Sequence, residues 1–146
     1  MPKNDPTRLF GFLIHEIARL LSRAFEQQTN ELNVTREQAR VLAYIAMNEG
    51  AKQADIAKLM DVQKIRITKL VDDLEQLKLI RRQSDPDDRR VKKLYVEDDA
   101  QIVLEGIWQR LSDISDIALS SIPTQERKKL VNHLSAVRDI LIESNG

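Results

Sequence analysis

The chain has 146 residues, 42% of them hydrophobic, which suits one domain or one small domain with added helices. Its 23 basic and 23 acidic side chains give zero net charge, and the absence of cysteine excludes disulfides, thiolate nucleophiles and cysteine metal sites. The longest uncharged apolar stretch, residues 9–14, is far shorter than the roughly 20 residues of a membrane span, and Met1–Asp5 lacks the apolar segment of a secretory signal, so we expect a cytoplasmic protein without a membrane partner.

A long amphipathic helix is predicted over residues 8–30. Apolar side chains recur there every four residues and form a wide stripe along one side, at Leu9, Leu13, Ile17, Leu21 and Phe25. Residues 33–35 break this pattern. A stripe of this length is too large to be buried against a small domain, and it predicts a partner surface.

Three shorter helices follow. Thr35 and Gln38 match a capping box that opens the first, which extends to about Gly50, and the second covers residues 53–60. Asp61 and Val62 form a tight break, because Asp tolerates the left-handed conformation better than most residues. The third covers residues 63–77, with an inner stripe of apolar residues and an outer face that includes Gln63, Lys64, Arg66 and Lys69.

The periodicity then changes to two residues, which predicts strands over residues 79–83 and 91–96. Residues 84–90 between them are polar and contain turn-forming Pro and Asp, so we expect a hairpin with a charged tip. Two more helices are predicted, one capped by Asp98 or Asp99 and extending to about residue 120, and one over residues 124–143.

Three short helices followed by a hairpin are typical of a winged helix-turn-helix. In that arrangement the third helix enters the major groove of DNA and the hairpin, or wing, follows the backbone toward the minor groove. Residues 52–93 contain 12 basic and eight acidic side chains, a net charge of +4 against −4 for the rest, which can attract a polyanion. The alternative interpretation of this bias is an ordinary solvated face. The long terminal helices favour a two-fold dimer.

The sequence resembles the MarR/SlyA family of bacterial winged-helix transcription regulators over about residues 8–143. The most specific part of the resemblance is the wing, residues 85–96, and the segments 35–42, 53–60, 70–75 and 79–82 also match in order and spacing. The resemblance implies a mainly α fold with a small β-hairpin wing. It also implies a winged helix-turn-helix DNA-binding domain at residues 31–97 and a helical dimerisation region at residues 8–30 and 98–146.

By this resemblance the protein is a repressor that binds a near-palindromic operator of double-stranded DNA as a homodimer. Arg90 is expected to enter the minor groove with Asp88 bracing it, although the same pair is also explained as an exposed loop ion pair worth little energy. Arg66 is a candidate to hydrogen-bond a guanine. The Thr68 hydroxyl is expected to bond either DNA or the backbone of its own helix. The full set of expected DNA contacts is Gln63, Lys64, Arg66, Thr68, Lys69, Asp88, Arg89, Arg90 and Lys92.

The sequence departs from the family pattern at three places. Lys52 stands where a capping Thr is common, so we expect a less satisfied helix start. Lys78 replaces the usual Gly after the third helix, where a left-handed conformation costs a non-glycine residue about 1 kcal/mol, and we expect a helix exit of different shape. Residues 65–67 are more β-branched and basic than usual, which predicts an unusual target sequence.

Members of the family commonly respond to small aromatic or phenolic anions, or to oxidation of a cysteine that this chain lacks. The resemblance places such a pocket between the terminal helices and the winged domain, near His15, Arg19, Tyr44 and Trp108. His15 is also explained as a structural side chain, and Trp108 as part of a core or dimer interface. No cofactor or metal is expected.

Catalysis is not expected. His15 and His133 are the only histidines, and the four glycines provide no phosphate-binding loop.

The alternative to DNA binding is a winged helix that binds a partner protein. Such a module has no need of Lys64, Arg66, Lys69 and the wing arginines on one side, whereas the acids of the wing partly offset those charges.

Overall fold

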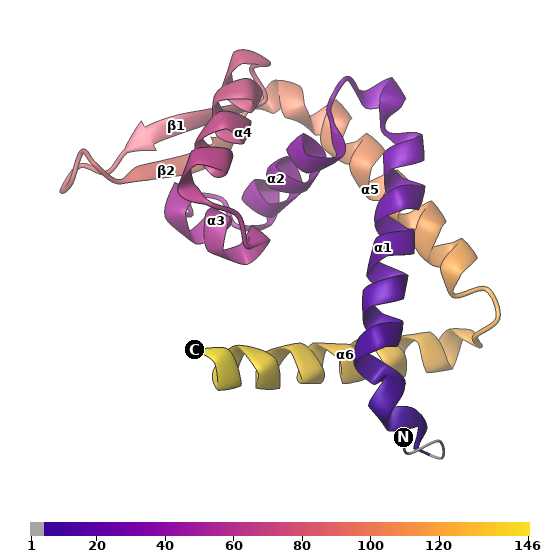
Figure 1. Ribbon diagram of the computed structural model, residues 1–146. Coiled ribbons are helices and arrows are strands. Elements are labelled where there is room, and N and C mark those ends of the chain that lie inside the picture. The colour runs from indigo at the N-terminus through magenta and orange to yellow at the C-terminus, as the bar shows by residue number, and fades with distance from the viewer. Residues whose placement is uncertain (1–4) are drawn as a thin grey trace. The chain divides into compact units, whose positions relative to one another are not determined.

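The computed structural model describes residues 5–146, apart from the side chain of Asn30. Most of the segment Met1–Asp5, for which we expect no secretory signal, therefore lies outside the described residues. The described chain forms six α-helices, three 3₁₀ turns (η) and a two-stranded antiparallel sheet. Figure 1 labels the α-helices and the strands. In chain order these are η1 Pro6–Leu9, α1 Phe10–Gln28, η2 Asn30–Leu32, α2 Arg36–Met47, α3 Gln53–Met60, α4 Lys64–Gln76, β1 Ile80–Ser84, β2 Lys92–Val96, η3 Asp98–Ala100, α5 Gln101–Ala118 and α6 Thr124–Asn145.

The mainly α architecture with a β-hairpin is confirmed. The chain divides into two compact units, one ending at Leu111 and the other covering Ser112–Gly146. None of the helices formed by residues 5–146 is long and apolar enough to cross a membrane.

The core of the first unit joins α2, α3, α4 and the hairpin. Its fully buried large side chains come from each of these elements and from α5, and they are Val41, Leu42, Ile45, Ile56, Ile67, Val71, Leu74, Ile80, Leu94 and Ile107. The amphipathic patterns of the short helices thus point inward as expected. By contrast, α1 buries only Phe25, and its apolar stripe stays exposed, for example at Phe12 and Leu13.

Local signals place the ends of these helices. Thr35 Oγ1 accepts a hydrogen bond from the Gln38 N–H, and Gln38 Oε1 accepts one from the Thr35 N–H, so the predicted capping box is confirmed. Asp61 has the left-handed conformation that we expected, with φ of 52°. Lys52 starts α3 without a side-chain cap, also as expected.

Asp98 and Asp99 do not cap α5, and that prediction is wrong. Both residues lie inside the 3₁₀ turn Asp98–Ala100, whose N-cap position is Glu97. The Glu97 N–H donates to the Leu79 carbonyl at 2.9 Å. This bond ties the chain to the start of the hairpin, and the helical segment begins at Asp98, one residue earlier than a cap at Asp98 would allow.

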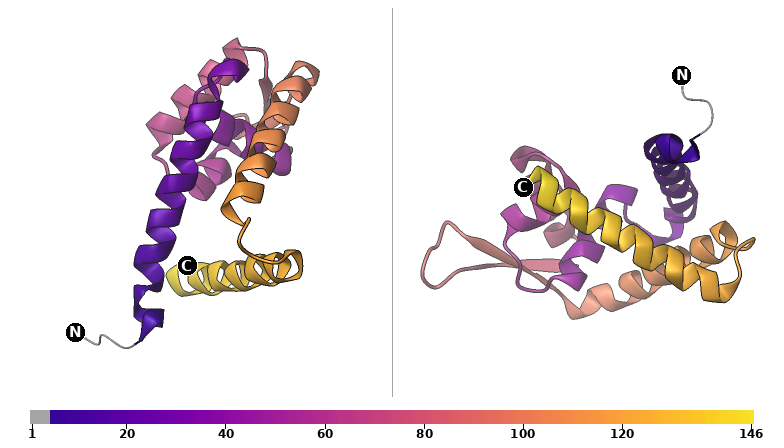
Figure 2. Two further views of the ribbon diagram at one scale, coloured as in Figure 1. Left: turned by 90° about the vertical axis from the view of Figure 1, so that its right-hand side faces the viewer. Right: turned by 90° about the horizontal axis from the view of Figure 1, so that it is seen from below.

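The hairpin is fixed to the helices at its base. Ile80 pairs with Val96 and Ser84 with Lys92 in a continuous antiparallel register. The loop before α3 adds a third short segment, because the Gly50 N–H donates to the Leu94 carbonyl and the Leu94 N–H donates to the Ala51 carbonyl. Gly50 has φ of +81°, and an added Cβ would lie 3.4 Å from the Tyr95 hydroxyl oxygen. Away from this base the hairpin projects from α2–α4, as Figure 1 and the right-hand view of Figure 2 show.

Lys78 follows α4 with φ of 60°, so the helix exit keeps the left-handed residue that a glycine would normally provide. The expected change of shape at this exit is wrong. The Leu79 N–H donates to the Leu74 carbonyl at 3.0 Å, a closing bond of the kind that requires a left-handed residue. The lysine therefore adopts the strained left-handed conformation, and the helix exit keeps its geometry.

Lys78→Gly is therefore expected to raise the free energy of unfolding by about 1 kcal/mol, because glycine removes the left-handed penalty. Thermal melts at one fixed protein concentration measure the change. Lys58→Gly, inside α3, is the matched control and is expected to lower stability by about 1 kcal/mol. Equal destabilisation by both variants would contradict strain at Lys78.

Candidate nucleic-acid interface

Helix α4 is held by its buried face and presents its first turn to solvent. Ile67, Leu70, Val71 and Leu74 are buried, and α4 packs on α2 and α3. Gln63 occupies the N-cap position without a side-chain cap. Four residues near the start of α4 are exposed, and they are Lys64, Ile65, Arg66 and Lys69. The turn after Asp61 thus aims the start of α4 outward, as a helix-turn-helix requires.

Arg66 is paired with a carboxylate of another helix. Its Nε and Nη2 atoms donate to Glu37 Oε2 on α2, at 2.9 and 2.7 Å. Both side chains stay about half exposed, so the pair is worth at most about 1 kcal/mol. The sequence did not predict this partner, because Glu37 lies 29 residues away from Arg66.

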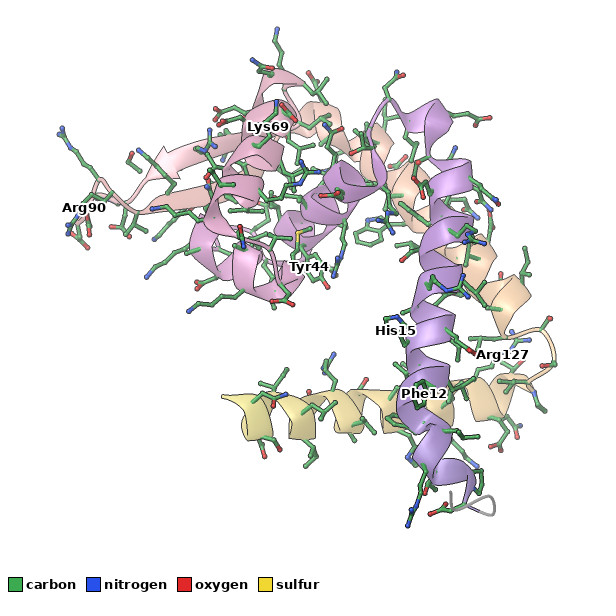
Figure 3. The ribbon with its side chains drawn as sticks, viewed as in Figure 1. Phe12, His15, Tyr44, Lys69, Arg90 and Arg127 are labelled. Atoms are coloured by element: carbon green, nitrogen blue, oxygen red, sulfur yellow. The ribbon has the colours of Figure 1, made fainter. Side chains whose placement is uncertain are left out.

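Thr68 and Lys69 are also engaged within the chain. The Thr68 hydroxyl donates to the Lys64 carbonyl at 2.8 Å, as one of our two interpretations predicted, and it accepts from Gln53 Nε2. Lys69 Nζ lies 2.7 Å from Asp73 Oδ1 one turn later. Its side chain remains largely exposed, and Figure 3 shows it on the outer side of α4.

Arg82 joins the wing to the helix-turn-helix, a role that the sequence analysis did not find. From β1 its guanidinium donates to Asp72 at 2.5 Å and to Glu75 at 3.2 Å, both on α4. Its Nε donates to Gln53 of α3, and its Nη2 reaches the Thr68 carbonyl. Only 19% of the side chain is exposed. The available signal was the pattern of acids at positions 72 and 75 followed by a basic strand.

The wing tip is a structured loop. Asp88 accepts bonds from the Arg90 N–H, from Nε at 3.1 Å and from Nη2 at 3.3 Å, a contact that both interpretations of this pair predict. The Arg90 side chain is 91% exposed and lies at the far end of the hairpin in Figure 3. Arg89 is exposed beside it.

Asp85 and Asp88 accept hydrogen bonds within the wing loop. Bonds from the side chain and backbone of Arg90 lower the pKa of Asp88 below its ordinary value. The Asp87 N–H and, after it, Lys93 lower the pKa of Asp85. A carboxylate with a lowered pKa keeps its stabilising contacts at neutral pH and loses them only as the pH falls through the lowered value. Asp88 is therefore ionised opposite Arg90 at neutral pH.

Positive charges from three elements line one groove. It lies between α3, α4 and the return strand of the wing, and its described lining contains four cations and no acid. These cations are Lys52, Lys64, Arg90 and Lys92. Lys92 also donates to the Ser84 hydroxyl at 2.7 Å. The groove has the positive charge that suits a phosphate backbone.

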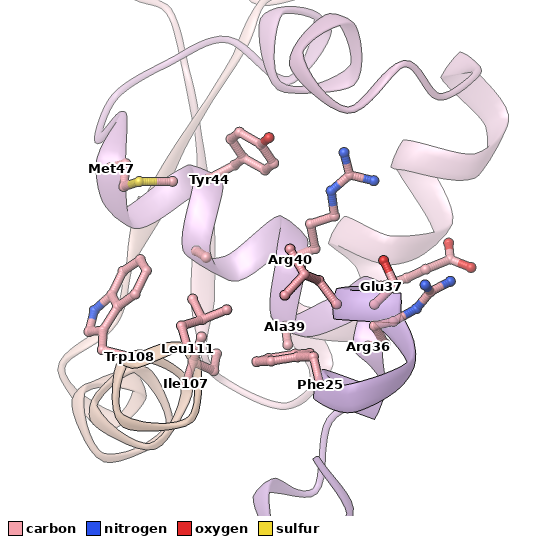
Figure 4. Close-up of a pocket in the computed structure, with 13 residues that line it drawn as sticks. Phe25, Arg36, Glu37, Ala39, Arg40, Tyr44, Met47, Ile107, Trp108 and Leu111 are labelled. Carbon is pink, nitrogen blue, oxygen red and sulfur yellow. The ribbon is translucent and has the colours of Figure 1, made fainter. Parts of the chain in front are cut away.

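The four residues expected around a small ligand fall into two hollows. Tyr44 and Trp108 line an apolar cavity of about 350 Å³ formed by α1, α2 and α5, shown in Figure 4. His15 and Arg19 line a more polar hollow along α1. Arg36 and Ser22 line both.

The cavity also contains charged residues that the sequence analysis missed. Arg36, Glu37 and Arg40 reach it from α2, and the Arg40 guanidinium lies 5.7 Å from the centre of the Tyr44 ring. Arg36, Arg40 and Tyr44 follow one another at four-residue spacing, which places them on one side of a helix. That spacing was the signal available in the sequence.

Two curated bacterial proteins match most of the chain. HTH-type transcriptional repressor MdtR of Bacillus subtilis is 33% identical over 103 residues, 70% of this chain and 66% of MdtR. HTH-type transcriptional regulator BilQ of Clostridioides difficile is 30% identical over 99 residues, 68% of this chain and 67% of BilQ. The chain is thus of the helix-turn-helix regulator class.

A model of the MarR family matches residues 32–91, which cover α2, α3, α4, β1 and the loop that leads to β2. The chain belongs to the MarR family of transcriptional regulators. Its relatives are named as regulators rather than enzymes, in agreement with the expectation that it has no catalytic site.

Solved structures show the same fold. The transcriptional regulator SlyA superposes with a TM-score of 0.80 at 26% identity, covering 92% of this chain and 95% of SlyA. The S. aureus MepR–DNA complex superposes with a TM-score of 0.73 at 22% identity, covering 89% of this chain and 96% of MepR.

Proposed function

We propose that this MarR-family regulator binds a near-palindromic operator in double-stranded DNA as a homodimer and acts in the cytoplasm as a repressor. The observation that carries the proposal is the groove whose cations come from α3, α4 and the wing. The outward first turn of α4 would lie in the major groove and Arg90 would enter the minor groove. The remaining contacts of the proposed interface are Gln63, Lys64, Arg66, Thr68, Lys69, Asp88, Arg89 and Lys92.

Two relatives support this proposal. The structural neighbour MepR is seen in a complex with DNA, and the relative MdtR is named a repressor. The brace of Asp88 on Arg90 supports the wing contact, because it restricts a long exposed side chain before DNA arrives.

In this proposal residues 31–97 bind DNA, and residues 8–30 and 98–146 form the dimer. The support is apolar surface that the single chain leaves exposed. On α1 it includes Phe12, Leu13 and Leu20, and on α6 it includes Ile140, Leu141 and Ile142. Exposed apolar side chains at this density mark an interaction surface, and a second copy is the partner that a two-fold operator requires.

We also propose that a small aromatic anion modulates DNA binding from the apolar cavity. The support is its chemistry, since Tyr44 and Trp108 offer ring surfaces while Arg36 and Arg40 offer charge. His15 and Arg19 line the adjacent hollow and would contact only a larger ligand. An effector acts if it binds one spacing of the two recognition helices better than another.

Fluorescence anisotropy with a labelled duplex from upstream of the protein's own gene tests the proposal, with a scrambled duplex of equal length as control. We expect preference for the native duplex and an affinity that falls steeply with salt, because phosphate contacts release counterions. Failure to bind any duplex, by protein shown to be dimeric, would contradict the proposal and favour a protein-binding module instead.

The Glu37–Arg66 pair yields a separate prediction. Glu37→Gln is expected to tighten DNA binding about threefold (about 0.6 kcal/mol), because it frees Arg66 from an exposed ion pair. Asp55→Asn on α3 removes the same charge from an exposed acid and serves as the matched control. In an Arg66→Ala background the gain should disappear. A gain that persists there would show a general charge effect rather than release of Arg66.

A further inference from the structure

Ile65 is an apolar side chain that the fold leaves uncovered. It is 82% exposed on the first turn of α4. Ile67, two residues later, is buried in the core. The core side of α4 is thus filled without Ile65. A β-branched residue also has a lower helix propensity than Ala or Leu. Ile65 therefore contributes neither to the core nor to the intrinsic stability of α4.

Basic side chains surround Ile65, two of them paired with carboxylates, Arg66 with Glu37 and Lys69 with Asp73. Lys64 and Arg66 flank it in the sequence, and Lys69 lies one turn later on the same side of the helix. Cations at this density attract a polyanion but give no reason for an isoleucine among them. The burial of that isoleucine becomes favourable only when the partner brings an apolar group to the same place.

The major groove of DNA offers one such group on its base edges, the 5-methyl of thymine. The N-terminal residues of a recognition helix are the ones that reach base edges, and Ile65 is the second residue of α4. The position of Ile65, its exposure and the flanking charges therefore all favour a thymine methyl as the group that covers it.

We propose that Ile65 is a specificity-determining residue that packs against the 5-methyl of a thymine in each half-site. This inference rests on the proposed function, since it requires that α4 enter the major groove. It adds an apolar contact to the polar contacts of Lys64, Arg66 and Lys69, and it assigns that contact to thymine.

The test removes the methyl from the DNA. Duplexes that bind the full-length wild-type protein are first selected from a random-sequence library. Each thymine of the selected duplex is then replaced by deoxyuridine, which keeps the base pair and lacks only the methyl. We expect one thymine per half-site at which affinity falls about fourfold, the loss that follows from about 0.8 kcal/mol for one methyl-sized group. Replacement in both half-sites should multiply the loss to about 16-fold.

The protein side of the test uses two isoleucines of equal exposure. Ile65→Ala should bind the thymine and deoxyuridine duplexes equally well. Ile102→Ala, which alters an 80% exposed isoleucine on α5, should retain the wild-type preference. Because Ala is the better helix former, Ile65→Ala should melt at or above the wild-type temperature, which separates a lost contact from a damaged fold.

The outcomes distinguish this inference from the proposed function. If duplexes are selected but no deoxyuridine replacement weakens binding, the inference fails and the proposed function stands. The same holds if Ile65→Ala keeps the thymine preference. If no duplex is selected at all, the proposed function fails and the inference fails with it.

Discussion

Arg82→Ala is expected to lower the free energy of unfolding by about 2 kcal/mol, the range of hydrogen bonds to charged groups in a partly buried setting. The Arg82 side chain bonds α3, α4 and the wing together, through Gln53, Asp72 and Glu75. Its loss leaves the two carboxylates beside each other without their common cation. Thermal melts at fixed protein concentration should show a midpoint lower by about 4–8 °C.

The neighbouring residue provides the control for Arg82. Arg81 has the same charge, but it is half exposed and meets Glu97 at 3.8 Å and the Tyr95 ring at 4.8 Å. Arg81→Ala should cost no more than about 1 kcal/mol. Arg82→Lys should recover only part of the loss, because an ammonium group cannot donate to the several acceptors that a guanidinium spans. Equal melting temperatures for Arg81→Ala and Arg82→Ala would contradict this role.

Arg90→Ala is expected to weaken DNA binding by about 1–3 kcal/mol, or roughly 5- to 150-fold, with no loss of stability. The Arg90 side chain is 91% exposed, and the hydrogen bonds described for it all go to Asp88, two residues away. Its removal therefore leaves the fold unchanged. The free protein already holds the guanidinium at the wing tip, so the loss falls on the complex with DNA.

Anisotropy titrations of wild type and variant on one duplex measure this effect. Arg138→Ala is the control for overall charge, because Arg138 is an exposed arginine that pairs with its sequence neighbour Asp139. It should bind DNA as wild type does. An Arg90→Ala protein that matches Arg138→Ala on the same duplex would show that the wing arginine makes no contact with DNA.

Local signals in the sequence predicted the fold well. The capping box at Thr35 and Gln38 and the left-handed Asp61 depend on neighbours within three residues, and the structure has both. The prediction of a cap at Asp98 or Asp99 was wrong, since a distant bond from Glu97 to Leu79 decides where that turn begins. At Lys78 the local preference of a lysine is likewise overridden, because the turn into the following hairpin requires a left-handed conformation there.

The candidate site was predictable as a set of charges but not as a set of contacts. The outward positions on α4 follow from the 3.6-residue period. The partners of Arg66 and Arg82 could not be predicted in the same way. Glu37 and Gln53 are each 29 residues distant from the arginine that they contact, and their meeting depends on how α2, α3 and the wing pack together. Tertiary packing therefore decides which cations are paired before DNA binds.

A hydroxyl-radical footprint on the native duplex tests the central claim most directly, because these radicals attack the sugars along the minor groove. Binding as a two-fold dimer through α4 and the wing predicts two symmetric protected regions. Their half-site centres should lie about 34–36 Å apart, one turn of DNA, and Arg90→Ala should lose the minor-groove protection. Binding as a two-fold dimer would be contradicted by a single asymmetric protected region. Contact of the wing with the minor groove would be contradicted by full protection that survives Arg90→Ala.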